Sequence, residues 1–572
     1  MQKKWVLPSE VDSKIVARIA NELELPLPLA EVLVQRGYQS VETANHFLES
    51  KLAQLQPPEG IPGIVAAVER LQKALQKKEK IILYGDYDVD GVTSLALLAR
   101  TLKKLGREVV CFLPDRLLEG YGLTRAAAER CLNAHRPDLL IVMDCGTNSL
   151  VEATFLKEAG VDLIIIDHHE PAANTVASVV DALVNPKLQK NSPDHIFCTV
   201  GLVFKLCHAF LKRFPNTEID LRHYLDLVAL GTVADIAPLV EENRIFVRYG
   251  LKQLERSHWP GVQALINVAE ARAPFSTIDI GFKLGPRLNA AGRLTSAEDA
   301  LKLLLSENKT EASRIARHLD RLNRERQAIE RTVTSEAEAW VEANLDLTLQ
   351  KSIIVGQREW HEGVIGIVAS RLVRRWHRPA IVIGFNKNGF GKGSGRSISK
   401  LPLVKALEAC APLLKAFGGH AMAAGLTLHE TRFEEFKLLF EKTVATFLSE
   451  EDLVPSLYLD AEVDLSMIHH AWLEVQERLA PFGPSNNQPL FFARAVRPLK
   501  EPRLLKEKHF RFEFIGSQGK ILNAIFFNGA LEDLPEPPWD LAFTIERNTF
   551  QGRSEPQIKV IDIRSHERIG KE

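Results

Sequence analysis

The sequence has few cysteines, and none of them belongs to a CxxC pair. A zinc site built from paired cysteines is therefore not expected. Most of the cysteines lie in apolar segments, which is typical of buried thiols in a protein of a reducing compartment. The six are Cys111, Cys131, Cys145, Cys198, Cys207 and Cys410.

Long apolar runs are missing as well. No uncharged apolar stretch reaches the roughly 18 residues that a transmembrane helix needs, so we expect no membrane span. The opening segment MQKKWVLPSE lacks the apolar core of a signal peptide. We therefore expect a cytoplasmic protein.

The sequence also lacks an excess of charge of either sign. Lys and Arg number 72 and Asp and Glu number 73, which excludes a broadly basic, histone-like binder but leaves room for a local basic groove. Hydrophobic residues make up 45% and charged residues 25%, so disorder, collagen-like structure and coiled coil are poor global descriptions. At about 150 residues per domain, 572 residues predict about three or four domains.

Apolar runs alternate with helical patterns from about residue 78 onward, which predicts βαβ units and a parallel sheet. The runs are nearly all apolar, as expected when helices cover both faces of the sheet. The predicted strands lie within KIILYGDYDVDG (80–91), REVVCFLPD (107–115), DLLIVMDCG (138–146) and VDLIIIDHHE (161–170). The predicted helices are 91–106, ended by Gly106, then 123–135 and 149–160.

The remaining segments predict a multidomain α/β protein. Residues 1–60 read as a helical extension, 61–300 as the first α/β domain and 301–345 as a long, charged connecting helix. A second α/β pattern covers 346–452. From 453 to 572, short alternating strands with turns predict a small β-barrel or sandwich.

Carboxylates and imidazoles gather at the ends of the predicted strands. In an open parallel sheet, ligands bind beyond the carboxyl ends of the strands, so these side chains are expected at one edge. They are Asp86, Asp88 and Asp90 after the first strand, Asp144 after the third, and Asp167, His168 and His169 after the fourth. Asp235 joins them from GTVADIAP, after an apolar helix.

Clustered carboxylates would repel one another and raise one another's pKa values unless cations neutralise them. Oxygen ligands with a minority of imidazoles suit Mn²⁺ or Mg²⁺ better than zinc. Two such ions, about 3.5–4 Å apart, can share a bridging carboxylate and activate water for attack on phosphorus. The alternative is that the acids are helix caps and loop charges.

Glycine-rich segments suggest contacts to phosphate. GKGSGRS (391–397) is predicted as a loop whose N–H groups and arginine could bind phosphate, or as an ordinary turn. Arg116 follows the second strand, and Arg287 and Arg293 flank a predicted glycine-rich loop facing the cleft. A surface ion pair is the alternative for each arginine. His420, in GGH, is predicted to contact substrate, with a buried, hydrogen-bonded histidine as the alternative.

Two further patterns stay open between DNA contact and ordinary structure. RLVRRWHR (371–378) is either a DNA contact or the solvated face of a helix. In the C-terminal strands, Phe510, Phe512 and Phe514 alternate with bases. Alternate aromatics are usually core, but OB-type barrels also use exposed ones to stack on single strands.

These motifs together resemble a known family. DYDVDG (86–91), MDCG (143–146), DHH (167–169) and VAD (233–235) resemble the four motifs of the DHH phosphoesterases. GSGRS (393–397) and FGGHAMAAG (417–425) resemble their DHHA1 domain. With GPRLNAAGR (285–293) and PFGPSNNQPLF (481–491), the chain is most similar to the bacterial exonucleases of this family. The resemblance covers about residues 60–572 and implies two α/β domains joined by a long helix, plus a C-terminal OB-like β-barrel.

The resemblance also implies roles for individual residues. Asp88 and Asp144 would hold one metal, with Asp144 bridging to a second ion. Asp90, His168 and Asp235 would complete the second site. His169 would lie beside the metals, where it would either support the metal ligands or contact the transition state.

One position departs from the family pattern. Many members carry a histidine four residues before the position of Asp88, where this chain has Tyr84. Asp86 or water could substitute as a ligand. Phosphate at the 5′ end would be bound by Ser394 and Arg396. The further substrate-binding candidates are Arg116, Arg287 and His420.

The resemblance thus implies a two-metal exonuclease that degrades single-stranded DNA from 5′ to 3′ into mononucleotides, in recombination and repair. Single-strand-binding protein and a helicase would be its partners, and we expect a monomer. One alternative is a DHH phosphodiesterase of short oligonucleotides or cyclic dinucleotides, which the segment after 452 counts against. The other is a non-catalytic DNA-binding scaffold, which the intact Asp88, Asp90, Asp144 and Asp235 count against.

Overall fold

The computed structural model describes residues 3–115, 119–214, 217–531, 534–550 and 553–566. The chain divides into two compact units. The first unit consists of residues 1–4, 58–235 and 253–455, and the second of residues 5–57, 236–252 and 456–572. The predicted domain limits at 60, 300, 345 and 452 stay predictions.

The first unit contains the predicted parallel sheet, with strand order β3-β2-β4-β5-β6. The strands are β2 (Ile81–Gly85), β3 (Val110–Phe112), β4 (Leu139–Met143), β5 (Asp162–Ile166) and β6 (Ala182–Val184). Every residue of β2 and β4 is buried. Four of these strands were predicted, and β6 adds an edge strand that the sequence pattern did not reveal.

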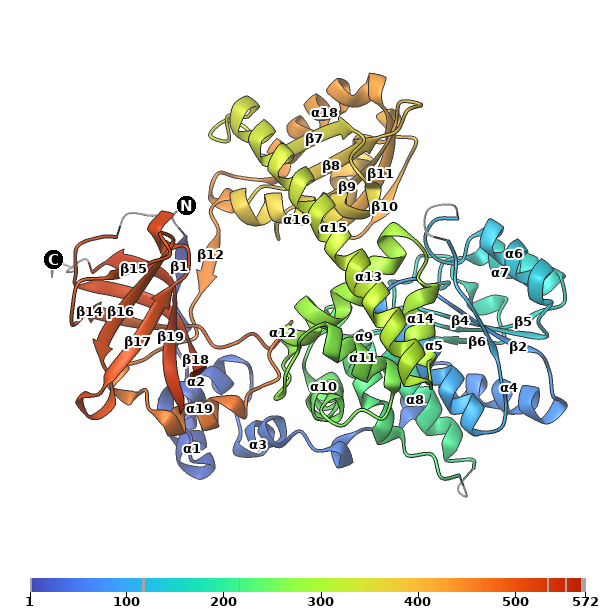
Figure 1. Cartoon of the computed structure of the whole chain (residues 1–572), viewed down its shortest axis with the longest axis horizontal. Helices are drawn as coiled ribbons and strands as arrows, with labels where there is room; N and C mark the ends of the chain where they lie inside the picture. The colour runs from blue at the N-terminus through green and yellow to red at the C-terminus, as the bar shows by residue number, and fades with distance from the viewer. Residues whose placement is uncertain (1–2, 116–118, 215–216, 532–533, 551–552, 567–572) are drawn as a thin grey trace. The chain divides into compact units, whose positions relative to one another are not determined.

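Helices cover both faces of this sheet because its side chains alternate between them. Ile82 and Tyr84 share one apolar cluster with Ala127 and Cys131 of α6, whereas α5 contacts β2 and β4 and packs against α8 and α9. Figure 1 shows α6 and α7 side by side next to the sheet. The helices are α4 (Ile64–Lys77), α5 (Val89–Lys104), α6 (Arg125–His135), α7 (Leu150–Glu158), α8 (Thr199–Leu211) and α9 (Leu225–Ala234). Because helices cover both faces, a ligand can reach this sheet only at the ends of its strands.

The predicted connecting helix is α15 (Lys309–Asn344), which leads from the first sheet to the second (Figure 1). It contacts α11 (Pro260–Val268), α13 and α14 (Glu298–Leu305), and further along it packs on α16 (Glu362–Trp376). Arg371 and Arg375, from the basic run 371–378, form ion pairs with Glu330 and with Glu338 and Glu342 of α15. Those two arginines therefore join the two helices, a role that neither interpretation of that run included.

The second sheet has the order β10-β11-β9-β8-β7 and corrects the prediction of a glycine-rich loop at 391–397. This segment is strand β9, paired with β8 on one side and β11 on the other. Its backbone N–H groups therefore serve the sheet rather than a phosphate. Its glycines fit because a Cβ on Gly391, Gly393 or Gly395 would meet neighbouring apolar side chains at 2.6–2.9 Å.

The elements of this second α/β part are as follows. The strands are β7 (Ile353–Arg358), β8 (Ala380–Phe385), β9 (Phe390–Arg396), β10 (Ala416–Gly419) and β11 (Ala423–His429). The helices besides α16 are α17 (Leu403–Glu408) and α18 (Phe433–Phe447).

The predicted glycine-rich loop at 285–293 is also wrong, since this segment is helix α13 (Gly285–Leu294). Pro286 stands in its first turn, where proline is tolerated. The helix follows the short α12 (Thr277–Asp279) and a π-helical turn, Ile280–Leu284. Gly292 serves close packing, because a Cβ there would lie 3.0 Å from the carbonyl oxygen of Tyr87.

The second unit is built on a seven-stranded sheet of order β13-β14-β18-β19-β17-β16-β15. The predicted N-terminal helices share its apolar core. Phe512 and Phe514 are buried in that core and Phe510 packs against it, so these aromatics are structural. Phe527, at the end of β17, is half exposed.

The bounds in the second unit are as follows. The strands are β13 (Ala461–Glu462), β14 (Phe491–Val496), β15 (Arg503–Leu505), β16 (His509–Ile515), β17 (Ile521–Phe526), β18 (Trp539–Phe550) and β19 (Arg553–Ser565). The helices are α1 (Ser13–Leu23), α2 (Leu27–Gln35), α3 (Val41–Glu49) and α19 (His470–Glu477). Helix α10 (Glu241–Leu254) and the short strands β1 (Lys4–Val6) and β12 (Ser456–Tyr458) lie where the chain passes between the units. Among the described residues, no helix is both long and apolar enough to cross a membrane.

Candidate metal centre and adjoining pocket

The predicted acids and histidines meet at the carboxyl ends of β2, β4 and β5. Three groups of side chains there have ligand atoms within 4.8 Å of one another. The groups are Asp86, Asp88 and Asp144; Asp90, His168 and Asp235; and Asp144, His168 and His169. Asp144 and His168 each belong to two groups, which makes them the centre of the arrangement.

Asp88 and Asp90 are positioned by helix starts. One carboxylate oxygen of Asp88 caps α5 by accepting from the N–H groups of Asp90 and Gly91, at 2.9 and 3.1 Å. Capping occupies only one oxygen, so the capping and metal-binding interpretations of Asp88 are compatible. The carboxylate of Asp90 accepts from the first N–H groups of α8, those of Thr199 and Val200, at 2.7 and 2.8 Å.

Asp144 follows β4 in a left-handed conformation, with φ of 67°. This region is costly for a residue with a side chain and is kept where the surrounding structure enforces it. The backbone N–H of Asp144 donates to the carbonyl of Ile166 on the neighbouring strand. Its carboxylate accepts from the hydroxyl of Thr199 at 3.0 Å, so α8 orients Asp144 as well as Asp90.

The DHH segment is organised by its own aspartate. Asp167 accepts from the backbone N–H groups of His168 and His169, from Nδ1 of His169 at 2.7 Å and from the N–H of Thr147. Burial would raise the pKa of Asp167, but these hydrogen bonds and the charge of His169 outweigh it and lower that pKa. On His169, burial is likewise outweighed by Asp167, so the pKa of the imidazole is raised. The other ring nitrogen of His169 lies 2.9 Å from the hydroxyl of Tyr121.

His168 faces the carboxylates with its ring nitrogen Nε2. Its Nε2 lies 3.5 Å from Asp144, 3.7 Å from Asp235 and 3.9 Å from Asp90. Nε2 is buried and makes no hydrogen bond within the described part of the chain. Burial, followed by the charge of His169, lowers the pKa of His168 to about 3, so the ring is neutral and able to bind a metal.

Burial and mutual repulsion raise the pKa values of the carboxylates. Asp90 reaches about 6, because it is buried and lies near Asp88. Asp235 reaches about 9 through burial and the charges of Asp90 and Asp88, and the pKa of Asp144 rises well above its usual value for the same kinds of reason. A neutral buried imidazole beside several carboxylates with raised pKa values is a ligand set that suits hard divalent cations.

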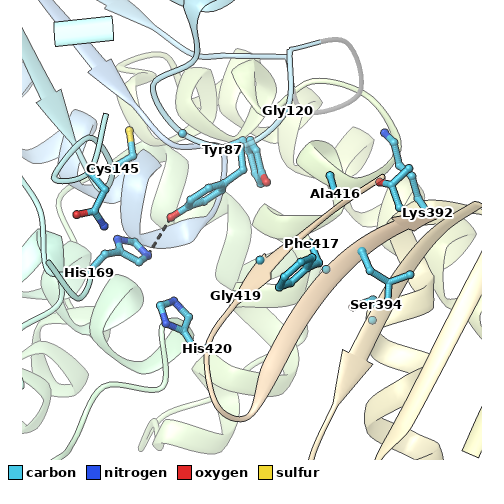
Figure 2. A pocket seen from close by; sticks show the side chains of 18 of the residues that line it. Tyr87, Gly120, Cys145, His169, Lys392, Ser394, Ala416, Phe417, Gly419 and His420 are labelled. Atoms are coloured by element: carbon cyan, nitrogen blue, oxygen red, sulfur yellow. Dashed lines mark hydrogen bonds between the residues drawn. The ribbon is translucent and has the colours of Figure 1, made fainter. Parts of the chain in front are cut away.

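A cavity of about 950 Å³ adjoins this centre. Its walls come from the loops after β2, β4 and β5 and from β9, β10, β11 and the start of α16. Figure 2 shows His169 and His420 near each other at one side, and Lys392 and Ser394 on the strands across the pocket. The rings of His169 and His420 are nearly parallel, with centroids 6.2 Å apart.

Ser394 and Arg396, the predicted phosphate contacts, line this cavity from a strand rather than from a loop. Arg396 donates to the hydroxyl of Ser394 at 3.1 Å and to the carbonyl of Gly395 at 2.8 Å. Burial lowers the pKa of Arg396, and no carboxylate among the described residues forms an ion pair with it. A half-buried guanidinium with no anion of its own is suited to bind one from solution.

One predicted residue is not brought to the cavity, and another cannot be placed. Arg287 pairs with Asp320 of α15 at 2.9 Å and is absent from the described cavity wall, although Arg293 belongs to it. Tyr84 is buried in the sheet and donates to the carbonyl of Gly122. Arg116 lies outside the described residues.

Sequence reasoning missed Thr199 and Tyr121 and gave no role to Asp167. Asp167 carried a signal, because it opens the same DHH motif as the two histidines. Thr199 and Tyr121 carried none, since each acts through a contact with a residue far away in the sequence. Tyr121 reaches His169 and Thr199 reaches Asp144 only when the chain has folded.

Family models match three segments of the chain. They are the DHH family N-terminal domain at 80–232, the DHHA1 domain at 350–446 and the RecJ OB domain at 459–562. These matches confirm the resemblance that the motifs predicted.

Individual proteins match most of the chain. The single-stranded-DNA-specific exonuclease RecJ of Bacillus subtilis (strain 168) is 36% identical over 561 residues, which cover 96% of this chain and 70% of that protein. The crystal structure of RecJ in complex with Mn²⁺ from Thermus thermophilus matches with a TM-score of 0.85 and 30% identity, over 99% of this chain and 80% of that one. The crystal structure of the Mg²⁺ complex of RecJ from the same organism matches with a TM-score of 0.79 and 28% identity, over 99% of this chain and 79% of that one.

Thr199→Val tests the positioning of Asp144. The variant keeps the shape and the backbone N–H bound to Asp90 but removes the hydroxyl that orients Asp144. We expect Mn²⁺ affinity to fall about 10-fold, because residues that orient metal ligands typically contribute this much. Titration calorimetry on EDTA-treated protein measures it. Thr199→Ser should bind Mn²⁺ like wild type, and an unchanged affinity in Thr199→Val would contradict the role of the hydroxyl.

The raised pKa values predict how pH affects the metal-free protein. The folded state binds protons on Asp90 and Asp235 more tightly than the unfolded chain does. This stabilisation is complete below about pH 4 and is lost as pH rises through about 6 and about 9. With EDTA, the free energy of unfolding should therefore fall between pH 6 and 9, by at most about 1.4 kcal/mol per pH unit for each proton.

Urea unfolding at pH 6, 7, 8 and 9 measures this dependence. Asp235→Asn should flatten it, since the amide does not titrate. Saturating Mn²⁺ should reverse it, because cations displace the protons most readily at high pH. Equal slopes for wild type and Asp235→Asn would contradict the assignment.

Proposed function

Because the chain belongs to the RecJ family of DHH exonucleases, we propose that it degrades single-stranded DNA from the 5′ end and releases mononucleotides. It is a metal-dependent phosphodiesterase, with Mn²⁺ or Mg²⁺ as cofactor. The observation that carries the proposal is one cavity that holds both His169, beside the acid cluster, and Arg396, a guanidinium that pairs with no carboxylate of the described residues. Such a cavity can hold a terminal nucleotide by its 5′ phosphate, at Arg396, and by the scissile phosphate on its 3′ side, at His169.

The acids and His168 would hold two divalent cations. Asp86, Asp88 and Asp144 form one ligand group and Asp90, His168 and Asp235 another, while Asp144 also groups with His168 and His169. Asp144 is thus the proposed bridge. When bound, the cations would lower the pKa of a water molecule and offset charge on the phosphate under attack.

The remaining residues would bind and orient the strand. Ser394 and Arg396 would hold the 5′ phosphate, and His420 would contact the terminal nucleotide near His169. His169, fixed by Asp167 and with a raised pKa, would donate to an oxygen of the scissile phosphate. Cleavage of the bond from phosphorus to the 3′ oxygen then frees one nucleotide and leaves a new 5′ phosphate on the strand.

The cellular setting remains a proposal. We place the enzyme in DNA recombination and repair in the cytoplasm, with single-strand-binding protein and a helicase as partners and the monomer as active form. The free thiols of all six cysteines agree with a reducing compartment. The match to the RecJ OB domain speaks against a hydrolase of short oligonucleotides, and the complete ligand groups speak against a silent scaffold.

Asp144→Ala tests the shared ligand. Turnover of single-stranded DNA should fall below about a tenth of wild type, because the bridging carboxylate positions both cations. DNA affinity, measured by fluorescence anisotropy, should change little, since it comes mainly from phosphate contacts elsewhere. More activity than this in the variant would contradict the two-cation assignment.

Arg396→Ala tests the 5′-phosphate contact and thereby the polarity. Losing a charge-assisted contact of a few kcal/mol should slow digestion of 5′-phosphorylated strands about 100-fold, at 1.4 kcal/mol per factor of ten. Strands with a 5′ hydroxyl should be slowed much less. The ratio of the two kcat/KM values cancels any general folding defect. Equal losses on both substrates would move the 5′ contact to another residue.

A further inference from the structure

The pocket continues along β9 beyond the proposed 5′-phosphate contact. Side chains alternate along a strand, so Lys392, Ser394 and Arg396 face the cavity together, and all three line it. Lys392 is two residues from Ser394, which places it about 7 Å further along the strand. The cavity therefore offers a second position next to the first.

Two glycines keep the sheet surface open between these positions. Gly425 lies opposite Ser394, and Gly418 lies opposite Gly425 on the next strand. A Cβ added to Gly418 would meet no atom within 4 Å, and one on Gly425 only the carbonyl of Gly393, at 3.9 Å. Both glycines line the cavity, so the space above them is open to a ligand.

The second position presents a cation and a hydroxyl. Lys392 lies opposite Thr427, and both line the cavity. The hydroxyl of Thr427 makes no hydrogen bond to any residue in the described ranges. The ammonium of Lys392 pairs with Glu362 at 2.7 Å, with side chains 56% and 35% exposed. Exposed pairs of this kind are weak, so an anionic ligand can displace Glu362 from Lys392.

We propose that Lys392 and Thr427 form a second anion subsite, which takes the outer phosphates of a strand whose 5′ phosphate carries a pyrophosphoryl group. The inference rests on the proposed function, because it places the first 5′ phosphate at Ser394 and Arg396. Adjacent phosphates of a triphosphate are closer together than Lys392 and Ser394 are along the strand. One phosphate group therefore cannot occupy both subsites, and the outer phosphates of the chain are the ones that extend from Ser394 toward Lys392.

The activity that follows is removal of a 5′-triphosphorylated nucleotide. Water adds to the first internucleotide phosphorus, and the bond from that phosphorus to the 3′ oxygen breaks. The terminal nucleotide leaves as a nucleoside triphosphate with a 3′ hydroxyl. The phosphate stays on the shortened strand as an ordinary 5′ monophosphate, and later steps release monophosphates.

The test compares four DNA strands of one sequence that end in a 5′ hydroxyl, monophosphate, triphosphate or adenylyl pyrophosphate. Chromatography identifies the first product, and kcat/KM is measured for each end. We expect the triphosphorylated strand to be digested and to release a nucleoside triphosphate first. Digestion of the adenylylated strand would show that the subsite also takes a pyrophosphate joined to a nucleoside. Rejection of both pyrophosphorylated ends, with the monophosphate strand digested, would overturn the subsite.

Lys392→Ala should lower the kcat/KM ratio of triphosphate to monophosphate ends about 10-fold, because it removes a charge-assisted contact made only by the longer end. Glu362→Gln should raise this ratio, since it frees Lys392. Lys442→Ala, at an exposed lysine of α18 outside the cavity wall, is the matched control and should leave the ratio unchanged. A ratio that is the same in Lys392→Ala and wild type would refute the role of Lys392. Failure of all strands, the monophosphate included, would instead contradict the proposed exonuclease function.

Discussion

The structure of the first unit depends on the cost of placing several carboxylates together at the end of one parallel sheet. Burial raises the pKa values of Asp90, Asp144 and Asp235, and the charge of nearby Asp88 raises all three further. The fold offsets part of this cost itself, because the first turn of α8 donates two N–H groups to Asp90 and a hydroxyl to Asp144. The remainder is what divalent cations, or protons in their absence, must neutralise.

The same constraint explains how closely the supporting helices pack. Helix α9, which ends at Asp235, can approach because of Gly231, where a Cβ would lie 2.6 Å from the hydroxyl of Thr93 and 3.1 Å from Asp90. Asp167 accepts hydrogen bonds from the backbone and the ring of the histidine segment. The groups proposed for chemistry thus lie at the ends of strands and at the starts and ends of helices, whose positions the packed core fixes. The groups proposed to bind the strand lie on the alternating face of β9.

Much of this architecture could be predicted from the sequence, and the failures have a common cause. Apolar runs such as 139–143 and 163–166 are uniform enough to identify buried strands, and the acids that follow them are expected at one edge from the geometry of a parallel sheet. The glycine-rich segments 285–293 and 391–397 were wrongly predicted as loops. Glycine is needed there because neighbouring segments pack closely against a helix in one case and a strand in the other, and a Cβ would meet their atoms at 2.6–3.0 Å. The alternating aromatics at 510–514 could have been core residues or exposed residues that stack on single strands, and their burial shows that they belong to the core.

The sequence by itself determined the alternation of strands and helices between residues 80 and 166, the choice of acidic and imidazole ligands, and the chemistry that such ligands favour. These properties depend on residue type and on spacing along the chain. Only the tertiary structure decided that Thr199 orients Asp144, that Tyr121 reaches His169 and that Arg287 pairs with Asp320 instead of lining the cavity. Each of these contacts joins residues more than 30 positions apart. Their geometry depends on how helices and strands pack, and no local pattern encodes that packing.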